Sequence, residues 1–183
     1  MKIELVPAAY VAQDLCKKIT SASFDIQNEW FFFDGAFNFS ANIQTSVNTW
    51  SNENFVAVNN GEIAAYLEGL WTRPLDIISG FRAINFNRKC PYLFAVAFKS
   101  YLEYLFVNRS CNALNWTVAL KNKRAVRQCE RFSSNYCGHY VGLRHHAQKS
   151  YAGKISDSTL YEITLNEFLE WKQSGYMRRL DLS

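Results

Sequence analysis

The alternation of apolar and polar residues predicts several strands. From Phe55, "NFVAV" and "EIAAYLEGLW" alternate on either side of Asn59-Asn60-Gly61. Asn-Gly supplies the positive φ angles of a tight turn, so this stretch predicts a β-hairpin. "KIELVPA" (2–8) predicts an earlier strand, and the apolar runs 77–86 and 113–120 predict two later ones.

Apolar positions at helical spacing predict helices around these strands. Residues 8–19 form one such segment, and "PYLFAVAFKSYLEYLFV" (91–107) predicts a long helix with proline in its first turn. "NKRAVRQCERFSSN" (122–135) predicts a basic helix that Asn122 can cap. Two strands and a closing helix are expected at 139–148, 158–165 and 166–176.

This order of elements predicts a mixed α/β or α+β fold with one central sheet and helices on both faces. With 183 residues, 49% of them hydrophobic, the chain is expected to form a single domain over residues 1–183. Residues 23–53 are rich in aromatic residues and asparagine and have no clear period. Within them, "EWFFFDGAFNF" (29–39) is expected either to pack over the sheet or to line an acceptor pocket.

Charge and cysteine content limit the ligands and the cellular compartment that we expect for this protein. Twenty Lys and Arg against sixteen Asp and Glu give a net charge of +4, which suits an anionic cofactor but does not require nucleic acid. Five cysteines without a CxxC pair are expected to be reduced thiols. The chain shows no signal-peptide pattern and no run long enough to span a membrane, so we expect a cytoplasmic protein without a membrane partner.

Other chemical motifs are weak. Cys129, Cys137, His139, His145 and His146 invite a zinc site, but their spacing fits no common zinc pattern, and no metal is expected. Neither Cys129 nor Cys137 has the local signature of a catalytic nucleophile. The sequence contains no P-loop and no G-x-G-x-x-G motif, so nucleoside triphosphate and dinucleotide chemistry are not indicated.

The stretch "NWTVALKNKRAVRQCERF" and the later "GHYVG" carry the most specific signal. They resemble the fifth strand, the Asn-x-x-Ala helix start and the next strand of the GNAT superfamily of acyl-CoA-dependent N-acyltransferases. The resemblance covers about residues 55–165, and phage- and bacterium-encoded members are the most similar. It implies a mostly antiparallel, twisted sheet of six to seven strands that is splayed between strands 4 and 5, where acetyl-CoA or another acyl-CoA binds.

The resemblance also implies where the cofactor lies. It places the backbone of the fourth strand, the loop before the long helix and the start of the basic helix at the cofactor: Ile84, Asn85, Phe86, Arg88, Lys89, Asn122 and Arg124. Arg124 and its neighbour Lys123 are equally compatible with a solvated helix face. The chain departs from the family pattern at Pro91 and Leu93, which replace small residues of a now degenerate pyrophosphate loop, and at Cys129, where members carry a tyrosine.

Acyl transfer to an amine requires a base for the amine, polarisation of the carbonyl and release of the thiolate. Glu68 is the candidate base because apolar neighbours would raise its pKa, although an outward-facing carboxylate is the alternative. Asn115 can orient the substrate or a water, or be a satisfied buried amide. Tyr136 is the candidate acid, with Tyr140 as the alternative, and Asp76 is the reserve candidate for the base. Arg82 is expected either to meet a substrate carboxylate or to form an ion pair.

Three functional hypotheses remain open. The first is an N-acyltransferase, an acetyltransferase by expectation, in which an amine of a small molecule or macromolecule attacks acyl-CoA directly in a ternary complex. The second is a binding module that has lost catalysis, which the degenerate loop favours. The third is an enzyme that modifies a nucleobase in DNA or RNA, which the interleaved cations and aromatic residues of 81–131 favour. A monomer or a homodimer is expected.

Overall fold

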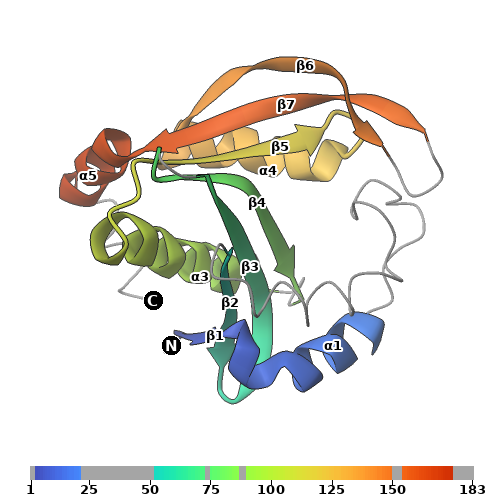
Figure 1. Ribbon diagram of the computed structural model, residues 1–183, viewed down its shortest axis with the longest axis vertical. Coiled ribbons are helices and arrows are strands. Elements are labelled where there is room, and N and C mark those ends of the chain that lie inside the picture. The colour runs from blue at the N-terminus through green and yellow to red at the C-terminus, as the bar shows by residue number, and fades with distance from the viewer. Residues whose placement is uncertain (1–2, 22–51, 73–74, 87–89, 150–153, 175–183) are drawn as a thin grey trace.

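A computed structural model describes residues 3–21, 52–72, 75–86, 90–149 and 154–174. The segment 29–39 and the residues Arg88 and Lys89 therefore lie outside the described residues. One seven-stranded sheet runs through the molecule, with helices on both faces (Figure 1). No helix in the described residues is long and apolar enough to cross a membrane.

The sheet has the strand order β1-β2-β3-β4-β5-β7-β6, and every neighbouring pair is antiparallel except β4 and β5, which are parallel. The strands are β1 (Ile3–Pro7), β2 (Asn52–Asn59), β3 (Glu62–Thr72), β4 (Ile77–Asn85), β5 (Ala113–Ala119), β6 (His139–Lys149) and β7 (Ile155–Thr164). The predicted fold class, a mixed α/β chain with a mostly antiparallel sheet, is confirmed.

The helices also follow the predicted order. They are the 3-10 turn η1 (Ala8–Val11) with α1 (Ala12–Ser21), then α3 (Pro91–Glu103), α4 (Lys123–Asn135) and α5 (Leu165–Gln173). Asn122 caps α4 as predicted, because its Oδ1 accepts the Ala125 N–H at 3.1 Å. The predicted hairpin is also confirmed, with φ of 51° at Asn60 and 80° at Gly61 between β2 and β3.

The predicted long helix 91–107 changes character at its end. It is α-helical to Glu103 and continues as a π turn, η3 (Tyr104–Asn108), in which the Arg109 N–H donates to the Tyr104 carbonyl at 3.1 Å. This wider turn lets Tyr104 and Arg109 both reach the buried carboxylate of Glu53, with Tyr104 Oη 2.9 Å from Oε2 and Arg109 Nε 2.7 Å from Oε1. The tertiary contact therefore explains the departure from the regular helix.

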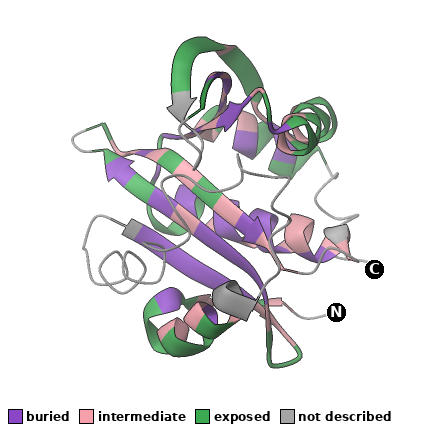
Figure 2. Cartoon of the chain, turned by 90° about the vertical axis from the view of Figure 1, so that its right-hand side faces the viewer, coloured by how far each residue is buried: buried purple, intermediate pink, exposed green. Residues whose placement is uncertain are grey.

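The core lies on both faces of the sheet, and Figure 2 shows buried residues concentrated along the central strands. On one face, Leu67, Ile78 and Leu114 pack with residues of α3, α4 and α5. On the other face, Val56 and Tyr66 pack with the region of α1. We call these the α3 face and the α1 face.

The sheet is splayed between β4 and β5, as predicted. The two strands pair only at Ile77–Ala113 and Ile78–Leu114, although β4 continues to Asn85 and β5 to Ala119. They diverge visibly in Figure 1. In the described residues, no strand pairs with this edge of β4 beyond Ile78, so the backbone from Ser79 onward is open toward β5.

A β-bulge lies beside the point of divergence. Residues 68–70 of β3 stand opposite residues 79–82 of β4, so β4 contains one extra residue, and Gly80 adopts a φ of 70°. Across from it, Gly69 allows α3 to approach closely. A Cβ on Gly69 would lie 2.6 Å from the hydroxyl of Tyr101 and 2.6 Å from Ile78 Cγ2. The bulge turns β4 away from β5.

Candidate active site between β4 and β5

Residues beside the divergence present polar side chains to the α1 face. Leu67, Ile78 and Leu114 point into the core of the α3 face. Because side chains alternate along a strand, the next residue on each strand points to the α1 face. These residues are Glu68 on β3, Ser79 on β4 and Asn115 on β5. The structure thus brings Glu68 and Asn115, two of the predicted catalytic residues, to one face.

Glu68 is a largely buried carboxylate beside a cation. Its side chain is 13% exposed, and Arg82 Nη1 lies 3.9 Å from its Oε2, directly across from it on β4. Burial raises the pKa of Glu68, whereas the Arg82 charge acts to lower it. Of the two roles expected for Arg82, the ion pair is the one observed. The net effect is a carboxylate that binds a proton more tightly than an ordinary glutamate.

The vertex of the splay is lined with small polar groups. Ser79 and Asn115 are the first residues after the last paired positions of β4 and β5. The hydroxyls of Ser79 and Thr72 are 2.5 Å apart, and Asn115 lies opposite Glu162 of β7. The vertex can therefore supply hydrogen-bond donors and acceptors from both walls to a polar ligand.

Five of the predicted cofactor residues are among the described residues, and they lie at the wide end of the splay. Ile84 is buried on the α1 face, Asn85 pairs with Ala65 of β3, and the Phe86 N–H donates to the Ala64 carbonyl at 3.0 Å. Here β4 pairs with β3 along one edge, and no described strand pairs with its other edge, toward β5. Asn122 and the exposed Arg124 stand at the start of α4, just beyond the end of β5.

Tyr136 lies apart from the other two predicted catalytic residues. It follows α4, and its ring packs against Phe132 at 5.2 Å and Trp171 at 6.0 Å between centroids. Trp171 belongs to the core of the α3 face, whereas Glu68 points to the α1 face. The structure therefore does not bring Tyr136 together with Glu68 and Asn115.

The two thiols considered as nucleophiles are shielded from solvent, Cys129 partly and Cys137 fully. Burial raises the pKa of Cys129 to about 11, although Trp116 Nε1 donates a hydrogen bond to its sulfur at 3.2 Å. Burial likewise raises the pKa of Cys137 to about 12, with the Glu167 charge adding to the effect. Because the thiolate is the reactive form, neither cysteine is poised for nucleophilic catalysis at neutral pH.

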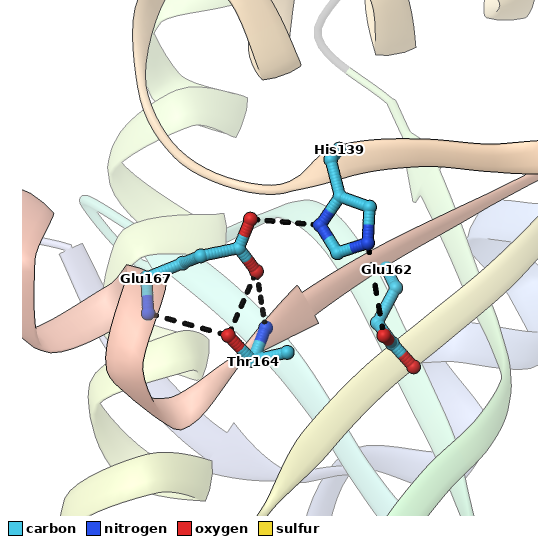
Figure 3. A network of polar contacts seen from close by, with 4 residues as sticks. All are labelled: His139, Glu162, Thr164 and Glu167. Carbon is cyan, nitrogen blue, oxygen red and sulfur yellow. Dashed lines mark hydrogen bonds and ion pairs between the residues drawn. The ribbon is translucent and has the colours of Figure 1, made fainter.

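His139 lies between two carboxylates at the end of β7 (Figure 3). Its Nδ1 is 2.7 Å from Glu167 Oε1, and its Nε2 is 3.8 Å from Glu162 Oε1. Glu167 and Thr164 also form a capping box, in which Glu167 Oε2 accepts the Thr164 N–H at 2.8 Å and the Glu167 N–H donates to Thr164 Oγ1 at 3.3 Å. These bonds fix the start of α5 against β6 and β7.

Glu167→Gln is expected to lower the free energy of unfolding by about 1 kcal/mol at neutral pH, because the cap loses its charge-assisted bonds. Partial burial acts to raise the pKa of Glu167, but the Thr164 N–H, the His139 ring and the Thr164 hydroxyl hold it below the ordinary value of 4.5. A carboxylate with a depressed folded-state pKa stabilises the fold above its unfolded pKa and loses that effect as the pH falls through the folded pKa.

Urea unfolding across the acidic range tests this expectation. The difference in unfolding free energy between wild type and Glu167→Gln should shrink as the pH falls below 4.5, the ordinary pKa of the group. Glu170→Gln on the exposed side of the same helix is the matched control. A difference that stays constant from neutral to acidic pH would show that the carboxylate charge of Glu167 does not contribute.

Comparison with known proteins supports the fold. No protein-family model and no curated protein match the sequence. Among solved structures, a GCN5-related N-acetyltransferase from Brucella melitensis is similar at a TM-score of 0.76 with 16% identity, over 97% of this chain and 82% of that one. The spermidine N-acetyltransferase from Vibrio cholerae in complex with CoA and spermine is similar at a TM-score of 0.69 with 13% identity, over 91% and 98%.

Proposed function

We propose that this chain, which has the fold of the GCN5-related N-acetyltransferases, transfers an acyl group from acyl-CoA to an amine. The observation that carries the proposal is the open edge of β4 after Ile78, with the largely buried Glu68 close by on the neighbouring strand. An open strand edge accepts an amide-containing chain as a further strand would. Amine acylation by direct attack needs little more than this edge and a base.

Groups along both sides of the splay are of the kind that acyl-CoA would require. Between Ser79 and Asn85, β4 offers backbone N–H and C=O groups that can pair with the amides of a pantetheine arm. At the wide end, the N-terminus of α4 and the side chain of Arg124 supply positive charge for phosphates. Leu93, which replaces a small residue of the family's pyrophosphate loop, is only 4% exposed, so its side chain is turned into the protein.

The acyl-CoA would supply an acyl group activated as a thioester. Backbone N–H groups of β4 near the bulge can donate to the carbonyl oxygen as negative charge develops on it. Glu68 would accept a proton from the acceptor ammonium, because its raised pKa makes it a stronger base than an ordinary glutamate. The nitrogen would lose its second proton to solvent water as the C–S bond breaks and the carbonyl re-forms. Ser79 and Asn115 would hold the acceptor by hydrogen bonds. A thiol with a pKa of about 8.5 leaves readily as the thiolate, so the remote position of Tyr136 is compatible with turnover.

Thermal unfolding with acetyl-CoA and with free CoA tests the binding step. We expect the Tm to rise with ligand concentration, since a ligand at a hundredfold excess over its Kd stabilises the folded state by about 2.7 kcal/mol. ATP is the control, because it carries phosphates without a pantetheine arm. No shift with either CoA species at millimolar concentration, or an equal shift with ATP, would contradict the proposed site.

Release of free thiol in the presence of candidate amines tests the transfer step. Spermidine and spermine are the first acceptors to examine, because one structural neighbour is a complex with spermine. Lysine-containing peptides and nucleosides with exocyclic amines extend the set. Stabilisation by acetyl-CoA without thiol release from any of these classes would favour a binding module that has lost catalysis.

A further inference from the structure

A basic surface lies on α4 and extends past Arg124, the one residue that it shares with the proposed cofactor site. A hollow of about 520 Å³ is lined by Lys121, Lys123, Arg124, Arg127, Gln128 and Arg131. All six residues are exposed. We call this surface the α4 basic face. Five of its six residues carry a positive charge, and none carries a negative one.

The cations of the α4 basic face have no acidic partner in the part of the chain that the structure describes. Among the described residues, no ion pair involves any of its five cations. The first turn of α4 also contains no acidic residue. Cations near a helix N-terminus oppose the helix dipole, so Lys123 and Arg124 are electrostatically unfavourable for the isolated fold. An anionic partner would remove this repulsion.

The arrangement of the cations forms a row. Arg124, Arg127 and Arg131 are spaced by three and four residues, so they share one side of the helix. At 1.5 Å per residue, the row spans about 10 Å along the helix axis. The opposite side of α4, including Val126 and Phe132, packs against the core of the α3 face and holds the helix in place.

We infer that the α4 basic face binds the phosphate backbone of a nucleic acid. A single terminal phosphate group could be contacted by the first-turn residues alone. A row of cations about 10 Å long better matches the repeating phosphates of a nucleic acid backbone. Arginine forms bidentate hydrogen bonds with phosphate, and arginine makes up the row. Contacts of this kind position a nucleic acid without reading its sequence, so binding is expected to depend strongly on salt and weakly on sequence.

Fluorescence anisotropy with labelled oligonucleotides, single-stranded and duplex, tests the inference. If all five cations contact phosphates, the slope of log K against log salt approaches about −4.5 for the duplex and about −3.5 for the single strand. Arg127→Glu/Arg131→Glu is expected to weaken binding at least tenfold and to reduce the steepness of the slope. Arg127→Lys/Arg131→Lys keeps the charge but loses the bidentate geometry, so it should keep the salt slope and bind less tightly than wild type but more tightly than the glutamate variant.

Two controls show whether oligonucleotide binding depends on the α4 basic face itself, and not on the cofactor site or on the net charge of the protein. Lys17→Glu/Lys18→Glu on α1 makes the same change in net charge elsewhere and should leave binding nearly unchanged. The Arg127→Glu/Arg131→Glu variant should keep the thermal shift with acetyl-CoA, which also shows that it is folded. The inference fails if wild type does not bind at low salt, if the α1 variant weakens binding equally, or if free CoA competes fully with the oligonucleotide.

Discussion

Glu68→Gln is expected to lower kcat/KM for amine acylation by about 100- to 10,000-fold, the range that a general base contributes. The glutamine keeps the shape of the side chain and its position beside Arg82 but cannot accept a proton. Glu62→Gln, at the exposed hairpin end of the same strand, is the matched control and should remain active. Activity of Glu68→Gln within threefold of wild type would remove Glu68 from the mechanism.

The pH profile provides an independent measurement on the same residue. A carboxylate base is active when deprotonated, so kcat/KM should rise with pH through the pKa of Glu68, which burial places above the ordinary value of 4.5. Arg82→Gln removes a charge that lowers this pKa, so the rising limb should move to higher pH. A limb that does not move would indicate that another group titrates.

Glu53→Ala is expected to destabilise the fold by about 3 kcal/mol, at the lower end of the cost of breaking a buried ion pair. The Glu53 side chain is 9% exposed, and its carboxylate accepts hydrogen bonds from Trp71 Nε1 at 2.8 Å, Tyr104 Oη at 2.9 Å and Arg109 Nε at 2.7 Å. Alanine would leave these donors without their acceptor. We expect a cost at the lower end of that range because the Arg109 side chain is 41% exposed and can be solvated when Glu53 is removed.

Urea unfolding measures the loss of stability in Glu53→Ala, and the titration of Tyr104 tests whether the loss comes from the missing carboxylate. Burial raises the pKa of Tyr104 to about 12, and both the hydrogen bond and the charge of Glu53 contribute. In Glu53→Ala the tyrosine should therefore titrate at lower pH. Glu53→Gln keeps an acceptor oxygen and should cost less than the alanine variant. A loss below about 1 kcal/mol for Glu53→Ala would show that solvent replaces the missing acceptor.

Local sequence patterns were sufficient to predict most of the helices, strands and turns. The Asn60-Gly61 turn and the Asn122 cap could be predicted because a few neighbouring residues determine each geometry. The capping box of α5 was missed, although "TLNE" (164–167) carries the Thr-x-x-Glu signature and could have identified it. The closing helix accordingly begins at Leu165 and not at Asn166.

Tertiary contacts account for what the sequence could not reveal. Glu53 lies 56 residues before Arg109, and nothing in the neighbourhood of either residue indicates that they meet. The position of Tyr136 depends on how α4 and α5 pack together. For Glu68, burial was expected from its apolar neighbours in the sequence. Tyr66 does lie on the same face, whereas Trp71 belongs to the core of the other face, so proximity along the chain identified the surroundings only in part.

The two-pair contact between β4 and β5 has a mechanical consequence. A continuous sheet distributes load over many hydrogen bonds, whereas here β1–β4 and β5–β7 are joined by two residue pairs and by bonds around Asn112, whose N–H donates to the Asp76 carbonyl at 2.8 Å. A molecule lying in the gap would bridge the two half-sheets. Rigidity of the whole protein and occupancy of its site would then be coupled, and amide hydrogen exchange along β5 should slow when the gap is filled.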